Sequence, residues 1–381
     1  MRFDFTEEEN MLREQVRSLA REKIAPLSAA GEEGESQEIA NQMIKAIGDR
    51  GLCALLVPQD FGGVGVRAVN VCIVREELSK VSNQADMLFA ELGIGTYGIT
   101  LKGSTEQKRK YLTRAAKGEL LASFALTEPN AGSDVAGIES RVRRDGDCYV
   151  LNGEKAFASV AGLAGLYLVF AKTDPAKGRK GISAFTIERG TPGAEVGRMP
   201  IMAGLPEYTI TLKDCRLPRG SLVGEEGEGW EIAFSTLDMF RVTVGAAFLG
   251  LAQAAFEEAF NYAGNRKAFG QPIAGFEATQ FKLADMATEI EAARWMVYRA
   301  AYLKDEGKLS RTIKYASMAK LFATEVAWRV ADEAVQIHGG WGVTKGFKVE
   351  RLLREARLAR IYEGTSEIQR LTIYREIERG N

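Results

Sequence analysis

Glu363 is the acidic residue whose surroundings best fit a catalytic base. It lies between Ile361-Tyr362 and Gly364, directly before a segment that is typical of a helix start. This position lets the side chain enter a pocket while nearby backbone amides stay available for a carbonyl group. The chain contains 51 Asp and Glu residues, and most such groups are solvated surface charges. The residue type alone therefore does not identify Glu363 as a catalytic base, and the elements that position it must be considered.

The segment Phe124–Asp134 has the composition of a ligand-binding loop. Thr127 and Ser133 offer hydroxyl groups, and Gly132 allows backbone amides to approach a polar ligand closely. The same residues would also suit a capped turn at the start of a β domain. The segment therefore indicates one of these two structures.

Three further positions carry groups that suit an aromatic or phosphate ligand. Phe157 and Ser159 combine an aromatic face with a hydroxyl, although an ordinary strand with a buried Phe has the same pattern. The guanidinium of Arg266 suits a pyrophosphate, or a helix C-terminus whose dipole it complements. Gly339 and Gly340 follow an expected helix and permit close backbone approach or a helix cap.

Composition excludes several classes of function. A formal net charge of −1 argues against a nucleic-acid-binding face or a polybasic membrane anchor. The lone histidine, His338, excludes a multi-histidine metal centre, and the four scattered cysteines form no metal motif. The acidic start Met1–Glu7 does not resemble a signal peptide, and the apolar run Leu163–Ala171 is too short to span a bilayer. We therefore expect a cytoplasmic protein without a metal.

Proline placement divides the chain into three regions. Six of the nine prolines lie between Pro129 and Pro218, and proline breaks helix interiors. The expected fold class is α+β, with an N-terminal α-helical domain at 1–120, a middle antiparallel β-barrel or sandwich at 121–222 and a C-terminal four-helix bundle at 223–381. In the first two regions, the expected helices are Glu38–Arg50, Val69–Lys80 and Thr105–Lys117, and the expected strands are Cys148–Leu151, Leu166–Ala171, Ile182–Ile187 and Tyr208–Leu212.

Local signals predict where some of these elements begin and end. A capping-box pattern starting at Thr6 predicts a helix that ends at Pro26. Asn152-Gly153 predicts a turn after a strand. Ser366 and Gln369 match a second capping box, which predicts the start of the last helix.

Gly63–Ala68 matches the dinucleotide-binding pattern G-x-G-x-x-A. That fingerprint requires a buried strand directly before it and a βαβ alternation after it. Here Pro58–Asp60 intervene and no such alternation follows. We therefore expect a tight turn before a helix rather than a nucleotide site.

Several long motifs, in the same order, resemble those of the acyl-CoA dehydrogenase family. Phe124–Asp134 and Ile361–Arg370 resemble its two signature regions, and Arg266–Gly270 and Gln336–Gly342 lie between them in the family order. The likeness covers nearly the whole chain and is closest to short- and medium-chain members. It implies an FAD-dependent enzyme with a helix–β–helix domain order.

The resemblance also implies residues that bind FAD. In the family, positions matching Phe157 and Ser159 are tryptophan and threonine, so an aromatic face and a hydroxyl are retained here. The residues that match the flavin-contacting loop and turn are Phe124, Leu126, Thr127, Ser133, Phe157, Ser159, Thr365 and Glu367. Those that match contacts to the FAD of a neighbouring subunit are Arg266, Phe269, Gln336, Gly339 and Gly340.

The resemblance further implies the reaction. Glu363 matches the base that removes the α-proton of an acyl-CoA thioester, and burial must raise its pKa for that task. Some members carry the base one residue before the arginine of the central helix, where this chain has Phe240, which cannot accept a proton. The residues that match substrate contacts are Ser133, Asp238, Arg241 and Gly364.

The implied partners are an acyl-CoA substrate, an electron-transferring flavoprotein and further copies of the chain, as a dimer of dimers. No nucleic acid or membrane partner is expected. Two alternatives stay open. One is an acyl-CoA oxidase or flavin monooxygenase of the same fold. The other is a helical scaffold that has lost its flavin, because Phe157 and Glu277 depart from the family pattern, which usually has tryptophan and glutamine there.

Overall fold

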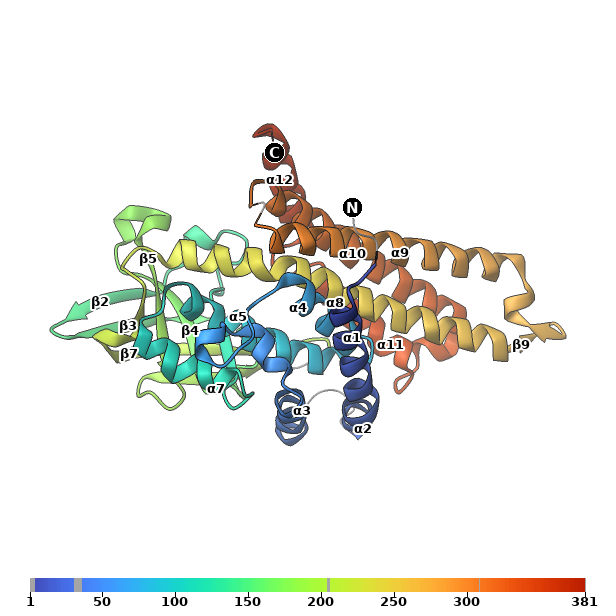
Figure 1. Cartoon of the computed structure of the whole chain (residues 1–381), viewed down its shortest axis with the longest axis horizontal. Coiled ribbons are helices and arrows are strands. Elements are labelled where there is room, and N and C mark those ends of the chain that lie inside the picture. The colour runs from blue at the N-terminus through green and yellow to red at the C-terminus, as the bar shows by residue number, and fades with distance from the viewer. Residues whose placement is uncertain (1–3, 31–35, 204–205, 308, 381) are drawn as a thin grey trace.

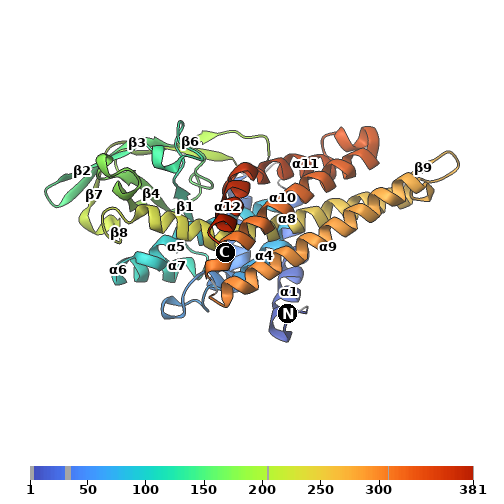
Figure 2. The ribbon, with the colours of Figure 1, turned by 90° about the horizontal axis from the view of Figure 1, so that it is seen from above.

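The protein is described by a computed structural model, which covers residues 4–30, 36–203, 206–307 and 309–380. Figure 1 shows a β domain at one end of an elongated molecule, with short helices beside it and long helices running to the opposite end. Figure 2 shows α8, α9, α10 and α11 extending away from the sheet. The α+β class and the helix–β–helix order expected from the sequence are confirmed.

The N-terminal helices follow the predicted segments closely, with one omission. The capping box at Thr6 is present, with the Thr6 hydroxyl accepting from the Glu9 amide at 3.0 Å. Pro26 does not end the first run; it lies in α2, directly after the π-helical turn Ala20–Ile24 that continues α1. The helices are α1 (Glu7–Leu19), α2 (Ala25–Ala30), α3 (Gln37–Asp49), α4 (Ala68–Ser79), α5 (Asn83–Lys102), α6 (Thr105–Gln107) and α7 (Thr113–Ala115).

Helix α5 was not predicted, because its glycines mask its helical pattern. Glycine lowers helix propensity, and α5 contains Gly93, Gly95 and Gly98. Here the glycines serve packing. A Cβ on Gly95 would lie 2.6 Å from the backbone of Ala122 in β1, and one on Gly93 would lie 2.8 Å from the Phe240 ring.

The middle domain is one twisted sheet, with strand order β6-β7-β3-β2-β4-β5-β8 and β1 beside β4. Its pairings are mostly antiparallel, but β4 pairs in parallel with β1 and at one point with β2. The strands are β1 (Ala122–Ala125), β2 (Arg141–Asp145), β3 (Cys148–Lys155), β4 (Leu166–Lys172), β5 (Ile182–Glu188), β6 (Ala194–Met199), β7 (Glu207–Pro218) and β8 (Leu222–Val223).

The turn predicted at Asn152-Gly153 is wrong, because both residues lie inside β3. The pairing of β3 with β7 shifts register there, which marks a bulge. A Cβ on Gly153 would lie 2.2 Å from Ser140 Oγ. The glycine is therefore required for a close contact within the sheet rather than for a reversal of the chain.

The C-terminal domain packs around α8. This helix has a window long and apolar enough to cross a membrane, but 89% of that window is buried inside the protein, as in a core helix. Phe248 and Val330, on two long helices of this domain, are fully buried. The helices are α8 (Gly229–Asn265), α9 (Glu277–Asp305), α10 (Leu309–His338), α11 (Lys348–Ala359) and α12 (Ser366–Glu378).

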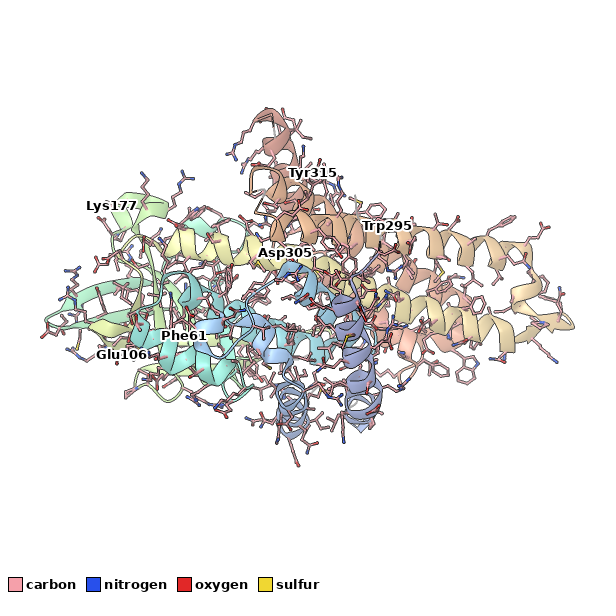
Figure 3. The ribbon with its side chains drawn as sticks, in the orientation of Figure 1. Phe61, Glu106, Lys177, Trp295, Asp305 and Tyr315 are labelled. Carbon is pink, nitrogen blue, oxygen red and sulfur yellow. The ribbon has the colours of Figure 1, made fainter. Side chains whose placement is uncertain are left out.

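The glycine pattern at 63–68 forms a tight turn, as predicted. The amides of Gly63 and Gly65 donate to the carbonyls of Pro58 and Val57. The first two amides of α4 donate to Asp305 at the end of α9, at 2.6 and 3.1 Å. Figure 3 labels Asp305 near the middle of the molecule. A side chain thus occupies the helix N-terminus that a phosphate would need.

Candidate active site

Glu363 lies in the short turn between α11 and α12 and has a left-handed backbone, with φ of 51°. Only a few per cent of non-glycine residues adopt this conformation, so surrounding contacts must hold it. Lys320 Nζ donates to the Gly364 carbonyl at 2.8 Å, and Gln369 Nε2 donates to the Glu363 carbonyl at 3.2 Å. The turn is therefore fixed from two helices, α10 and α12.

The Glu363 carboxyl is sheltered from water and incompletely bonded. Its Oε2 is buried and has no hydrogen-bond partner among the described residues. Burial raises the pKa of Glu363, while the nearby charges of Arg75, Lys320 and Arg241 oppose that rise. A desolvated carboxylate with a free oxygen is the form that a general base requires.

Arg75 is the strongest cation acting on Glu363, and the sequence did not reveal it. Its guanidinium is 2% exposed, binds both oxygens of Asp86 at 2.8 Å and donates to Thr243 Oγ1 at 2.9 Å. In the sequence, Arg75 begins a run of charges that is typical of a solvated helix face. The apolar residues on both sides of that run were the signal that it is buried.

Lys320 is a second buried cation that the sequence analysis missed. It is fully buried, and its Nζ donates to the carbonyls of Ala359 and Gly364, both at 2.8 Å. Burial lowers its pKa to about 8. Lys320 lies on the same face of α10 as the buried Ala316 and Ala323, and a lysine on such a face was the available signal.

Asp238 and Arg241 are brought together on α8, as their spacing suggests. Arg241 is 6% exposed and its Nη1 donates to Asp238. Its Nε is buried without a partner in the described part of the chain. Phe240 packs in the core, edge-on to Tyr97 with ring centroids 5.7 Å apart.

The loop after β1 is anchored by a buried ion pair. Lys155 Nζ contacts Glu128 Oε1 at 2.6 Å and donates to the Leu126 carbonyl at 3.3 Å. Burial opposes ionisation of Glu128, but Lys155 and backbone amides outweigh it and lower the pKa of Glu128. The Thr127 carbonyl accepts from the Ala156 amide at 2.9 Å. The loop is therefore joined to the segment that carries Phe157.

Phe124 and Ser133 differ in exposure: Phe124, in β1, is half-buried, and Ser133, in the loop, is exposed. The Phe124 ring packs against Phe170, with centroids 4.9 Å apart, whereas Ser133 is exposed. The two hydroxyl-bearing residues therefore differ in exposure: Thr127 is half-buried, and Ser133 lies on the open surface. These positions fit a loop whose base is structural and whose tip contacts a ligand.

Phe157 and Ser159 follow β3 directly. Phe157 is 56% exposed and has φ of 53°, and the nearby Val160 has φ of 55°. Ser159 Oγ donates to Glu207 Oε1 at 3.0 Å. An exposed aromatic ring on a strained backbone leaves an apolar face uncovered, as a flat ligand would require. The reading of this segment as an ordinary strand with a buried Phe is wrong.

A second group of expected cofactor residues lies at the far end of the bundle. Arg266, Gly339 and Gly340 line one cavity of about 480 Å³, together with Tyr262, Ile273, Ile337, His338, Trp341 and Thr344. His338 is buried, bonds the Ala334 carbonyl at 2.8 Å and stacks on Tyr262. Tyr262 and Trp341 were not predicted, although both are aromatic residues beside the motifs.

Phe269 lies at the tip of a hairpin formed by β9 (Lys267–Ala268) and β10 (Gln271–Pro272), next to this cavity. It is 96% exposed with φ of 49°, and Gln336 is also exposed. Arg266 lies about 38 Å along α8 from Arg241, at 1.5 Å per residue. Figure 1 shows the hairpin at the opposite end of the molecule from the sheet. One chain therefore does not bring the two groups of expected FAD residues together.

The start of the last helix differs from the prediction. Thr365, not Ser366, is the N-cap and accepts from the Ile368 amide at 3.3 Å. Ser366 Oγ donates instead to Glu325 at 2.6 Å, and Gln369 turns back to the Glu363 turn. Glu367 is exposed in the first turn of α12.

Comparison with known proteins identifies the family. Three family models match the chain: the acyl-CoA dehydrogenase N-terminal domain at residues 6–119, the middle domain at 123–215 and the C-terminal domain at 227–378. The chain belongs to the acyl-CoA dehydrogenase family. Its members are FAD-dependent oxidoreductases, and solved neighbours include complexes with FAD.

Relatives and solved structures match over the full length. An acyl-CoA dehydrogenase of Bacillus subtilis is 42% identical over 97% of each chain, and a short-chain-specific one of Clostridium acetobutylicum is 40% identical over 100% of each. Butyryl-CoA dehydrogenase of Megasphaera elsdenii has a TM-score of 0.93 at 34% identity, covering 99% of this chain and 100% of that one. A chain solved with the electron transferring flavoprotein of Acidaminococcus fermentans has a TM-score of 0.94 at 38% identity, covering 100% of both.

Proposed function

We propose that this acyl-CoA dehydrogenase uses FAD to convert an acyl-CoA into a 2-enoyl-CoA, with Glu363 as the base that takes the α-proton. The observation that supports this role is the buried, unpartnered Oε2 of Glu363. Burial raises the pKa of this carboxyl, which brings its basicity closer to that needed for a weakly acidic C–H bond. Arg75 and Lys320 keep a deprotonated form accessible.

The turn around Glu363 would also stabilise the thioester oxygen. The carbonyls of Glu363 and Gly364 are held by Gln369 and Lys320. This fixes the peptide groups of the turn and lets its amides point at a substrate carbonyl, where negative charge develops as the proton leaves. Arg241, with its unpartnered Nε, and Asp238 would bind the CoA portion, and Ser133 would contact the acyl thioester.

The chain's residues fit FAD. The exposed Phe157 face, the Ser159 hydroxyl and the loop at Leu126 and Thr127 would hold the flavin ring; Thr365 and Glu367 would lie near it. When bound, the flavin accepts the hydride that leaves the β-carbon. The protein's task is to place the acyl chain between that ring and Glu363, and to exclude water.

We propose a homo-oligomer, a dimer of dimers, because one chain presents its two groups of FAD residues at opposite ends. Arg266, Phe269, Gln336, Gly339 and Gly340 of one chain would then complete the site of another. We propose an electron-transferring flavoprotein as the acceptor, which the A. fermentans neighbour supports. A location in the cytoplasm is consistent with the four unpaired cysteines.

The test is anaerobic reduction of the bound flavin by acyl-CoA, with Glu363→Gln as the variant. We expect rapid bleaching in the wild-type protein and a loss of about 10⁴-fold or more in the variant. Equal bleaching rates would contradict the proposal. Oxygen consumption during turnover would indicate an oxidase instead, and a colourless protein that FAD does not reconstitute would indicate a scaffold.

A further inference from the structure

Glu207 is a buried carboxyl that the proposed dehydrogenation does not use. It is the first residue of β7 and is 9% exposed. Ser159 donates to its Oε1 at 3.0 Å, whereas its Oε2 is buried and has no partner within the described residues. Burial raises the pKa of Glu207 to about 7. A buried acceptor without a donor is rare in a native structure and indicates a missing ligand group.

Glu91 on α5 lies near Glu207, close enough for the charges of Glu207 and Glu363 to act on it. Burial and these charges raise the pKa of Glu91 well above its usual value. The half-buried Tyr362, directly before Glu363 in the chain, is also close enough to Glu207 to be affected by its charge. Three carboxyls, one from each domain, therefore converge where the acyl group must lie.

Glu207 is buried and Glu91 is half-buried. Neighbouring carboxyls do not both ionise readily, so the pair holds a proton near neutral pH. Such a pair offers an acceptor oxygen and an O–H donor side by side. A hydrocarbon chain would leave Glu207 Oε2 without a donor, and a terminal carboxylate would be repelled. A hydroxyl or amine would fill the vacant position.

We propose that Glu91 and Glu207 form a polar subsite for an acyl-CoA whose acyl chain carries a hydrogen-bond donor, a hydroxyl or an amino group. This inference rests on the proposed function, because it assumes that an acyl-CoA occupies the cavity beside Glu363. Ser159 orients the Glu207 carboxyl, and Phe240 packs against Gly93, two residues after Glu91 on α5.

The test measures binding in a Glu363→Gln background, in which ligands stay unreacted. Dissociation constants for butyryl-CoA, 4-hydroxybutyryl-CoA and glutaryl-CoA are obtained from the change in flavin absorption and by calorimetry. We expect 4-hydroxybutyryl-CoA to bind about tenfold more tightly than butyryl-CoA, and glutaryl-CoA to bind most weakly. Adding Glu207→Met or Glu91→Gln should each bring the first two constants within about threefold of each other. Glu195→Met, an exposed change on β6, is the matched control.

Equal binding of the first two ligands, or a preference that survives both substitutions, would overturn the subsite. The FAD content of each variant is measured to detect a third outcome. If Glu207→Met loses FAD but still binds 4-hydroxybutyryl-CoA more tightly than butyryl-CoA, the carboxyl binds the cofactor and the inference is wrong. Turnover by the wild-type protein is scored separately. A protein that binds the hydroxylated ligand preferentially but oxidises none of the three contradicts the dehydrogenase proposal, not the subsite.

Discussion

Lys320 on α10 donates to the carbonyl of Gly364 at 2.8 Å, so a fully buried ammonium fixes the turn that presents Glu363. The same Nζ bonds the carbonyl of Ala359, the last residue of α11. One side chain thus ties the end of one helix to the residue after the base. The geometry of the base depends on a residue that need not touch the substrate.

We expect Lys320→Met to impair catalysis more than folding. The substitution removes a donor from the carbonyls of Ala359 and Gly364, of which Gly364 keeps Gln369 as a donor. This costs about 1–3 kcal/mol for a carbonyl left unsatisfied and lets the Glu363 turn relax. The bleaching rate at saturating acyl-CoA should fall by about 10²-fold, since small misplacements of a base cost that much. Stopped-flow reduction and thermal melting measure the two effects; the exposed Lys345→Met is the control. A large loss of stability with a normal rate would show that Lys320 does not position the base.

The pH dependence of kcat/KM should report the raised pKa of Glu363. Only the deprotonated carboxyl accepts a proton, so the rate rises with pH through this pKa, and the acid limb should lie above the ordinary value of 4.5. Arg75→Met should move that limb up by about one pH unit, and Asp86→Asn should move it down, because they remove opposite charges. Shifts of the same sign in both variants would exclude this electrostatic account.

The Lys155–Glu128 pair should make the stability of the protein depend on pH in the acidic range. The pKa of Glu128 is lower in the folded protein than its ordinary value of 4.5. Its contribution to the free energy of unfolding is therefore present above pH 4.5 and is lost as the pH falls through the pKa of the folded state. We expect the melting temperature to fall more steeply below about pH 4.5 in the wild-type protein than in Lys155→Met/Glu128→Leu. Parallel melting curves for both proteins would contradict this role. FAD content of the double variant tests whether the pair also positions the flavin loop.

Subunit complementation tests the shared FAD site. Glu363→Gln inactivates a chain's own base, and Arg266→Glu would damage the site of its neighbour. In a mixed dimer, one of the two sites has both an intact Glu363 and an intact Arg266. Since random pairing makes about half of the dimers mixed, refolding the two inactive proteins together should restore about a quarter of the wild-type activity, averaged over all sites. No recovery, with mixed dimers shown by differential tagging, would mean that Arg266 serves its own chain.

The sequence predicted the domain order and most element positions because periodicity and proline placement act locally. It missed α5, since three glycines lower its helix propensity, although Gly95 and Gly93 are needed for contacts with β1 and Phe240. It placed Glu363 before a helix but did not reveal the roles of Arg75, Lys320 or Glu207. Apolar neighbours indicated that the first two are buried, but the contacts that give all three their roles come from distant segments.

The Asp305 carboxylate that receives the first amides of α4 lies 237 positions beyond Ala68. During synthesis, α4 therefore leaves the ribosome long before its capping group exists. Its first turn stays frayed until the end of α9 arrives, so the N-terminal helices gain their final stability only late in translation. A truncated chain ending before Asp305 should accordingly show rapid amide exchange at Ala68 and Val69.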